Sequence, residues 1–382
     1  MRRIRLLLAV ACLLALLLPS AMAGELLTTI SQASGDSLLE YPQLTSLPNS
    51  FVQDSVNQAI KEAVAPHENT FLVLQAGSEG SLRVTSRYHV LPAADSHDLL
   101  SLLITAQGRM PNGRPGFEYL PLMFDLANGQ PITAAEVFAD PAAAQAWLEE
   151  EADARLGEDL SVYLDLQALR PLPLERLLVH PAGISFYYPE GTFTWLSGRS
   201  ASLHYLFHEI QPLLNLEEGS LLHSLGVNTL LAPGGQTAAL LEETVTSGCL
   251  PGLDACLGEP VEDAVARLKL LHDPEGHPEG QQYQMEDDSF RGSLLLSSDG
   301  QTVDGILSRR MNLFGLITGQ ANRETAQAAL GQPFASLPLP ASAAQLYGLE
   351  EGQMDAYLYE GHELRLYYDT NDLLYAVWLK QQ

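Results

Sequence analysis

The run Leu99-Leu100-Ser101-Leu102-Leu103-Ile104 is a short apolar stretch that predicts a β-strand, which we place at Leu99–Gln107. Before it, Leu82–Val90 alternates apolar and polar residues, which also predicts a strand. After it, Met110–Gly116 is rich in Pro and Gly, as turns are, and Phe117–Leu126 predicts another strand. The first half of the chain is therefore expected to be built around a β-sheet.

Helical patterns surround these strands. Ser50–Val64 carries apolar residues at helical spacing, and Pro141–Leu156 begins with Pro, which is favoured in a first helical turn. Thr133 is a suitable cap for a short helix at Ala134–Phe138. Further strands are expected at Phe71–Leu74, Ile184–Tyr188 and Phe193–Trp195, whereas 24–39 is polar and weakly patterned. The pattern predicts an α+β fold with a mixed or antiparallel sheet and helices.

The second half contains a short internal repeat. Leu257-Gly258-Glu259-Pro260 returns as Leu330-Gly331-Gln332-Pro333, and an irregular stretch and a set of strands are expected after each copy. Two hairpins are predicted, one pairing Gly292–Leu296 with Val303–Leu307 and the other pairing His362–Tyr368 with Leu374–Leu379. We therefore expect a first domain at 40–214, a linker at 215–246 and a smaller α+β tandem-repeat domain at 247–382.

The first 23 residues have the grammar of a secretory signal peptide. Three arginines precede the apolar run Leu6–Leu18, and Ala21-Met22-Ala23 offers small residues for cleavage. An uncleaved anchor is disfavoured because a spanning helix needs about 20 apolar residues. A lipoprotein site at Cys12 is disfavoured because the apolar run continues past it. The expected location is secreted or extracytoplasmic, with no membrane span after cleavage.

The chain is strongly acidic. Its formal charge is −27, and loss of the three signal arginines, with no acidic residue beside them, makes the mature charge −30. Such a field repels nucleic acid phosphates, so no nucleic acid partner is expected. It favours a cationic partner or Ca²⁺, and solubility alone is the simpler explanation.

Cys249 and Cys256 are the cysteines that remain after cleavage of the signal. They lie close together around Pro251-Gly252, which favours a turn. In an exported protein such a pair predicts a disulfide. A redox pair is disfavoured because the CxxC spacing is absent.

Several segments of the first half occur together in a known order. They are Tyr41-Pro42-Gln43-Leu44, Asn57, Leu99–Leu102, Tyr119–Phe138, Ser185-Phe186-Tyr187-Tyr188-Pro189 and Gly198. This order resembles the extracytoplasmic domain of unknown function found in the RsiV anti-sigma factor and in PdaC-type peptidoglycan deacetylases, over about 40–214. The resemblance implies an α+β fold, an envelope location and, as in RsiV, lysozyme binding. An anti-sigma or deacetylase role is not implied, because the chain lacks an internal anchor helix and a deacetylase domain.

The second half, about Ser247–Leu379, resembles the tandem units of the β-lactamase inhibitory protein and the SmpA/OmlA envelope lipoproteins. The residues that carry this resemblance are Gly319 and Ala329-Leu330-Gly331-Gln332-Pro333 with the strands after them. Those relatives bind or assemble and are not catalysts.

Motifs for catalysis or metal binding are weak. No Gly-x-Ser-x-Gly elbow and no phosphate loop occur. His204 and His208, beside Glu209, have zinc-compatible spacing but not the His-Glu-x-x-His order, so packing is favoured. An acidic loop suited to Ca²⁺ lacks EF-hand spacing and is expected to be solvated; its residues are His272, Asp273, Glu275, His277, Glu279, Glu286, Asp287 and Asp288. We predict no catalytic residues, no metal and no cofactor, although a carboxylate pair for glycan chemistry can be distant in sequence.

An aromatic cluster is the one candidate for ligand contact. Tyr187, Tyr188 and Trp195 lie on expected strands, where alternate side chains face opposite sides, so one ring of each Tyr pair should face outward. The same holds for Tyr367 and Tyr368. The leading hypothesis is a secreted, non-catalytic envelope-associated binding protein for a basic protein such as lysozyme or a cell-wall ligand. The alternatives are a cell-wall glycan or peptide hydrolase that uses acidic residues, and a structural or assembly factor.

Overall fold

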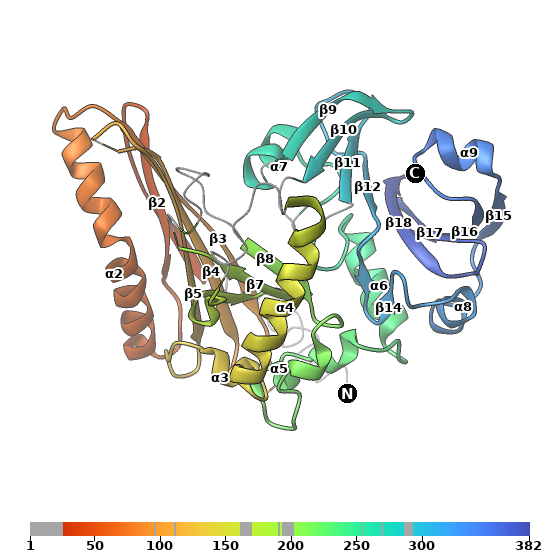
Figure 1. The fold of residues 1–382 in the computed structure, drawn as a ribbon, viewed down its shortest axis with the longest axis horizontal. Coiled ribbons are helices and arrows are strands. Elements are labelled where there is room, and N and C mark those ends of the chain that lie inside the picture. Colours follow the sequence, from red (N-terminus) through yellow and green to blue (C-terminus); the bar gives the residue numbers. More distant parts are fainter. Residues whose placement is uncertain are drawn as a thin grey trace, which may run out of the picture.

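The computed structural model describes residues 26–94, 97–110, 112–160, 170–189, 192, 202–253, 255–268, 270–285 and 293–382. The chain forms two bodies, each built on its own sheet (Figure 1). The sheets and helices confirm the predicted α+β class. Among the described residues, no helix combines the length and apolar character needed to cross a membrane.

The first sheet has five strands in chain order. Its β2 and β3 run parallel and its other neighbours are antiparallel, so the sheet is mixed. The strands are β1 (Leu27–Ser34), β2 (Ser37–Leu44), β3 (Ser81–Leu91), β4 (Leu99–Arg109) and β5 (Pro115–Asp125). The segment 24–39, which is polar and weakly patterned in sequence, supplies β1 and the start of β2, and these two strands form a hairpin.

Strand β4 is buried on both faces. Leu100, Leu102 and Ile104 belong to a core that includes helix α2, whereas Leu99 and Leu103 belong to a second core on the opposite face. Successive side chains of a strand point to opposite faces, so an apolar run needs a cover on each side. The fold supplies both covers.

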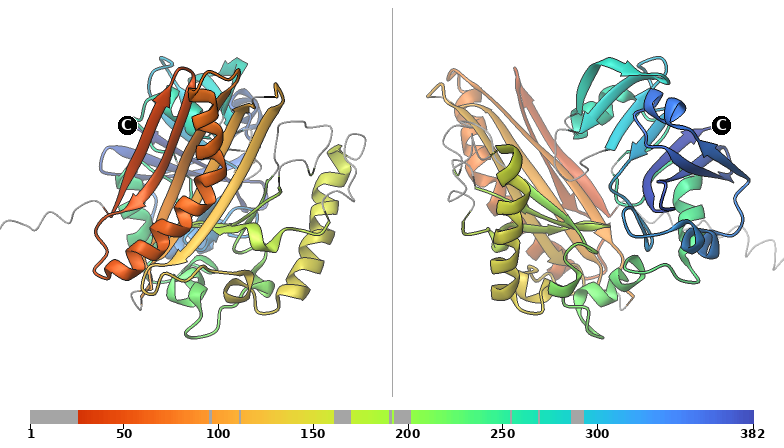
Figure 2. Two further views of the ribbon diagram at one scale, coloured as in Figure 1. Left: turned by 90° about the vertical axis from the view of Figure 1, so that its left-hand side faces the viewer. Right: turned by 45° about the vertical axis from the view of Figure 1, so that its right-hand side comes forward.

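Helix α2 (Ser50–Gln75) covers one face of this sheet, as the left view of Figure 2 shows. It continues through Pro66, and Phe71 and Leu74 extend its buried stripe. The strand predicted at Phe71–Leu74 was therefore wrong, because Pro66 does not end the helix. The Asn57 side chain exchanges two hydrogen bonds with the backbone of Leu44, at 2.8 and 2.9 Å, and ties β2 to the helix.

The opposite face is covered by a layer of short elements. Its small sheet has the order β6–β7–β8. The elements are α3 (Ala134–Val137), α4 (Pro141–Leu160), η2 (Leu174–Arg176), β6 (Leu177–Val179), β7 (Gly183–Tyr187) and β8 (Ser202–Leu206). Thr133 caps α3 as predicted, in a reciprocal arrangement with Glu136.

The predicted linker 215–246 contains helices. Its first part packs into the core of the first body through Leu222 and Val227, and its last part packs into the second body through Leu241 and Val245. After η3 (Gln211–Leu213), the elements are α5 (Leu221–Ser224), η4 (Val227–Leu230) and α6 (Thr237–Thr246).

The second sheet has eight strands in the order β15–β16–β17–β18–β12–β11–β10–β9. It is two four-stranded sets joined at the centre by the antiparallel pair β12–β18. The first set is β9 (Leu270–His277), β10 (Gly280–Met285), β11 (Ser293–Ser297) and β12 (Gly305–Ser308). The second is β15 (Ala335–Leu339), β16 (Gly352–Tyr359), β17 (His362–Tyr368) and β18 (Leu374–Gln381). Both predicted hairpins, β11–β12 and β17–β18, are confirmed.

Helices pack on both faces of this sheet. One core joins alternate strand residues with α6, α7 (Val261–Leu268) and α8 (Arg323–Leu330), and another joins the opposite residues with α9 (Ala341–Leu346). A two-stranded ribbon of β13 (Asn312–Leu313) and β14 (Leu316–Ile317) links the strand sets. The repeated tetrapeptides differ in context: the first precedes α7, where an irregular stretch was expected, and the second follows α8.

The two bodies are joined by a bidentate ion pair. Arg310 donates from Nε and Nη2 to the two carboxylate oxygens of Glu209, at 3.1 and 2.7 Å, and from Nη2 to the carbonyl of His204. Both charged side chains are mostly shielded from solvent, which favours a well-defined geometry. The pair ties the segment after β8 to the segment after β12.

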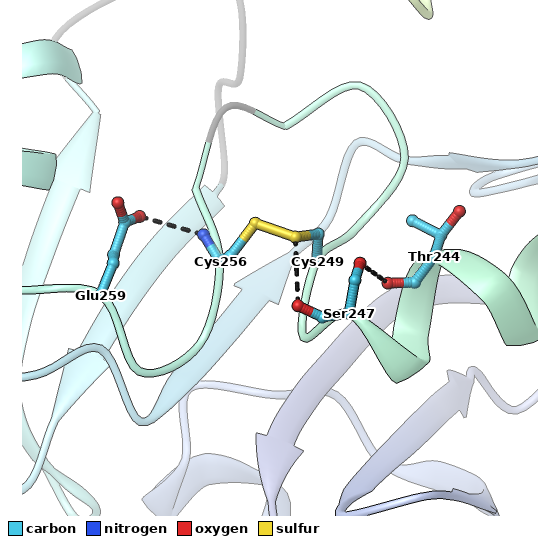
Figure 3. The surroundings of a disulfide bond; sticks show 5 residues. All are labelled: Thr244, Ser247, Cys249, Cys256 and Glu259. Atoms are coloured by element: carbon cyan, nitrogen blue, oxygen red, sulfur yellow. Dashed lines mark hydrogen bonds between the residues drawn. A yellow bond between two sulfur atoms is a disulfide. The ribbon is translucent and has the colours of Figure 1, made fainter. Parts of the chain in front are cut away.

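Cys249 and Cys256 form the predicted disulfide, which closes a loop between α6 and α7 (Figure 3). Gly252 in this loop lies against Ala182 of the first body and has a positive φ of 73°, so a side chain there would both clash and strain the backbone. The loop leucines Leu250 and Leu253 pack into the second core.

We predict that a chain beginning at Gly24 contains no free thiol when it is unfolded without reduction, because its two cysteines, Cys249 and Cys256, are paired. Thiol titration in denaturant should give no reaction before reduction and two thiols after it. Two thiols before reduction would contradict the pairing.

Asp355 on β16 is a fully buried carboxylate that is saturated with donors. It accepts two hydrogen bonds from Arg323 at 2.8 and 2.9 Å, one from Gln327 at 2.9 Å and one from Ser336 at 2.6 Å. Burial by itself would raise the pKa of Asp355, but the hydrogen bonds from these donors outweigh burial and lower the pKa. The network ties α8, β15 and β16 together.

We predict that Asp355→Asn lowers the free energy of unfolding by about 2–3 kcal/mol, because it leaves Arg323 and its neighbours without their anion. The matched control is Glu363→Gln, which breaks a more exposed Arg–Glu pair on β17 and should cost less than about 1 kcal/mol. Urea unfolding followed by Trp378 fluorescence, with Trp147 and Trp195 replaced by Phe, measures both.

The same pair of proteins tests the pH dependence. Because the pKa of Asp355 is lower in the folded state, its stabilisation is complete above about pH 4, the ordinary pKa of an unfolded Asp, and is lost as the pH falls through the folded pKa. The stability gap between wild type and Asp355→Asn should therefore shrink below about pH 4. An equal loss from both substitutions at pH 7 would refute this account of the network.

Candidate ligand-binding groove

A groove of about 750 Å³ lies beside β5, the last strand of the first sheet. Helix α2 forms one wall, and the turn after β5, the start of α4 and η2 form the other. Its lining residues are Ser55, Ala59, Pro121, Leu122, Met123, Phe124, Gly129, Gln130, Pro131, Ile132, Thr133, Ala134, Ala135, Pro141, Leu174 and Glu175. The volume lies within the range of ligand-binding pockets, and the lining is mainly apolar, as such pockets are.

The wall opposite α2 is formed by residues that are close together in the sequence. The Asn128-Gly129 turn folds against α2, where Gly129 has a positive φ of 74° and lies close to Val52. The backbone of Ile132 then donates to the carbonyl of Met123 at 3.0 Å, which closes the turn onto β5. Thr133 uses its hydroxyl to cap α3 with Glu136. The polar groups of this wall are thus largely satisfied within the wall itself.

Glu175 is the one charged residue among those that line the groove. It is exposed and lies on η2, next to Arg176. The Arg176 guanidinium points elsewhere: it donates to the carbonyl of Tyr187 at 2.9 Å and to the carbonyl of Tyr119. Burial lowers the pKa of Arg176, against the opposing effect of Glu118 and Glu175. Arg176 therefore fixes η2 to β5 and β7 and positions Glu175 at the groove.

A smaller hollow of about 410 Å³ shares Glu175 with the groove. Tyr188, one of the predicted contact residues, is among its lining residues, which are Gln145, Arg170, Pro171, Leu172, Pro173, Glu175, Tyr188, Pro189 and Thr192. Arg170 is paired with Asp153.

In each of the two Tyr pairs, one ring was predicted to face outward, and this prediction was wrong. Tyr187 and Tyr188 are 4% and 1% exposed, and Tyr367 and Tyr368 are equally buried. Tyr187 packs its ring against that of Tyr119, with 4.9 Å between the ring centroids, and all residues of β7 are buried. Tyr188 follows β7 and is buried as well. Trp195 and Phe193 lie outside the described residues. Ligand contact by Tyr187, Tyr188 or Trp195 stays a prediction.

The histidine pair lies outside any helix. His204 is on β8 and is buried, and His208 follows in a turn, where burial lowers its pKa. The i, i+4 geometry for zinc therefore does not form. Glu209, the third residue of that candidate, is engaged by Arg310.

The predicted acidic loop is partly a strand. His272, Asp273, Glu275 and His277 lie on β9, which pairs with β10. The Asp273 carboxylate accepts hydrogen bonds from Gln282 and Gln284, and His277 packs its ring against Trp378. The Pro and Gly residues of this segment favour a loop, which is why the sequence did not predict the strand. Glu286, Asp287 and Asp288 lie outside the described residues, and the described residues hold no metal-binding group of three or more His, Cys, Asp or Glu.

Ser185 forms an arrangement that sequence inspection missed. Its hydroxyl lies 2.8 Å from His180 Nε2 and 3.0 Å from His204 Nδ1. A serine beside imidazole is the geometry of an activated nucleophile, but Ser185 is 1% exposed. The hydroxyl therefore has no access for a substrate and serves the packing of β6, β7 and β8. No sequence motif joins these three separated residues.

The groove was not predicted from the sequence either. The signals at Asn128-Gly129 and Thr133 predicted a turn and a cap but not that these would face α2. No protein-family model matches the chain, and no curated protein matches it.

Three solved structures are similar to parts of the chain. A DUF3298 family protein from Bacteroides fragilis is 13% identical, with a TM-score of 0.35, over 52% of this chain and 96% of its own. A DUF3298 family protein from Pseudomonas aeruginosa is 12% identical, with a TM-score of 0.31, over 50% and 94%. A DUF4309 family protein from Bacillus subtilis is 16% identical, with a TM-score of 0.31, over 39% and 98%. These are families of unknown function, and at such scores the similarity supports no inference.

Proposed function

We propose that this chain is an exported, non-catalytic binding protein of the cell envelope and that its ligand binds in the groove between α2 and η2. The observation that carries the proposal is the groove itself, a preformed apolar hollow with one carboxylate at its lining. Helix α2 contributes Ser55 and Ala59 to one side, and α3, which Thr133 caps, contributes Ala134 and Ala135 to the other.

Export is supported by the N-terminal pattern of residues 1–23 and by the Cys249–Cys256 disulfide, a bond typical of oxidising compartments. We predict that the exported protein begins at Gly24, because Ala21-Met22-Ala23 offers the small residues that signal peptidase selects. N-terminal sequencing measures this. Recovery of intact Met1 in the membrane fraction would contradict it.

A basic protein is the partner that the charge favours. The mature charge of −30 speeds encounter with cations and does so less as salt rises. The RsiV-like order of segments in 40–214 adds lysozyme as the specific candidate, and the groove lies within that range. A hydrolytic role has no comparable support, and degradation of peptidoglycan by the pure protein would refute the non-catalytic proposal.

We predict that lysozyme binds the mature chain more tightly than a folded control protein of equal basicity does, at about 0.15 M salt, where long-range charge effects are screened. Ser55→Trp, which fills the groove from α2, should weaken lysozyme binding about tenfold or more if the groove is central to the interface. Asn69→Trp, on an exposed part of the same helix, is the control and should leave binding unchanged. Calorimetry measures all three.

Two outcomes would contradict this proposal. Similar weak binding of lysozyme and the control, lost together at moderate salt, would leave only the general charge effect. Equal weakening by Ser55→Trp and Asn69→Trp would remove the groove from the interface.

A further inference from the structure

We propose that the group that enters the groove is a cation carried on an apolar stem, an ammonium or guanidinium side chain that the basic partner presents to Glu175. This inference rests on the proposed function, since it takes the groove as the binding site. It adds the chemistry that the site selects and names the residue that selects it.

The groove walls select an apolar stem. Leu122, Phe124 and Ile132 contribute hydrocarbon surface, and Pro121 and Pro131 have no backbone N–H to donate. The other wall presents Ser55 and Ala59, one helical turn apart on α2, whose small side chains leave the space open. Methylene groups gain by leaving water for such a surface.

Glu175 selects the charge. It is the one charged lining residue, and among the described residues its carboxylate accepts no hydrogen bond and forms no close ion pair. Its neighbour Arg176 donates its hydrogen bonds to the carbonyls of Tyr119 and Tyr187, so it acts on Glu175 only through space, by the charge of its guanidinium. A carboxylate beside apolar surface gains from a cation and repels an anion. Lysine and arginine side chains have this chemistry, with a long apolar stem and a charged head.

The whole-protein field points the same way. A mature chain of charge −30 repels an anionic ligand and attracts a cationic one from a distance. General attraction has no preferred position, however. Specific recognition must therefore depend on Glu175 and not on an acidic residue elsewhere.

The experiment compares three eight-carbon probes, octylamine, octanol and octanoate, by calorimetry with the mature chain at about 0.15 M salt. Octylamine should bind roughly fivefold tighter than octanol, the scale of one partly exposed ion pair, and octanoate should bind weakest. Glu175→Gln should remove the advantage of the amine over the alcohol. Glu150→Gln, an equal loss of charge on the exposed side of α4, should preserve it.

Two variants that fill the groove, Ser55→Trp and Ala59→Phe, test where the probes bind. Each should weaken the binding of octylamine and of octanol to the same extent. Asn69→Trp should weaken neither. Circular dichroism confirms that each variant is folded. An amine-to-alcohol ratio that survives Glu175→Gln, or amine binding that survives both filling variants, would overturn the proposal.

The source of the cation is tested by competition. Octylamine should displace lysozyme, and Glu175→Gln should weaken lysozyme binding roughly fivefold. If octylamine binds in the groove but does not displace lysozyme, the ligand is a free amphiphilic amine and the partner side chain is refuted. If lysozyme does not bind at all, the proposed partner fails, while the amine-to-alcohol ratio still decides whether the groove has the stated chemistry.

Discussion

The burial of β4 on both faces is the constraint on which the first body depends. Leu100, Leu102 and Ile104 need one cover and Leu99 and Leu103 need another, and a shift of one residue in register would exchange the two sets. Helix α2 and the layer that contains α4 are those covers. Strand β5 ends the sheet, and the groove beside it is lined by residues of α2 on one side and of η2 and the start of α4 on the other. The candidate site thus depends on how β4 and its neighbour β5 are covered.

Two acidic residues of this chain, Asp355 and Glu175, lie in contrasting environments. Asp355 is fully buried and accepts four hydrogen bonds from three side chains. Its negative charge is therefore balanced within the second body and stabilises the packing there. Glu175 is exposed beside apolar surface and has no such donors. The net charge alone therefore does not distinguish the two residues, and the difference in environment is the reason that we propose Glu175 as the carboxylate for a ligand.

Local signals in the sequence predicted much of the fold, and long-range packing decided the rest. Strands β3, β4 and β5, the hairpins, the cap at Thr133 and the disulfide depend on neighbouring residues and were predicted correctly. Helix α2 passes through Pro66 because its buried stripe outweighs one lost hydrogen bond, and β1 forms on a polar segment because β2 offers a partner. The burial of Tyr187 and Tyr188 and the position of the groove depend on contacts between distant segments, which one sequence does not reveal.

The position of β18 in the second sheet has a consequence for biogenesis. This strand comes last in chain order but lies at the centre, between β17 and β12. During synthesis, the strands β9–β12 emerge first, and the edge of β12 lacks its partner until Leu374–Gln381 follow. An open strand edge invites pairing with other chains. A nascent chain halted before β18 would therefore be a client for holding chaperones.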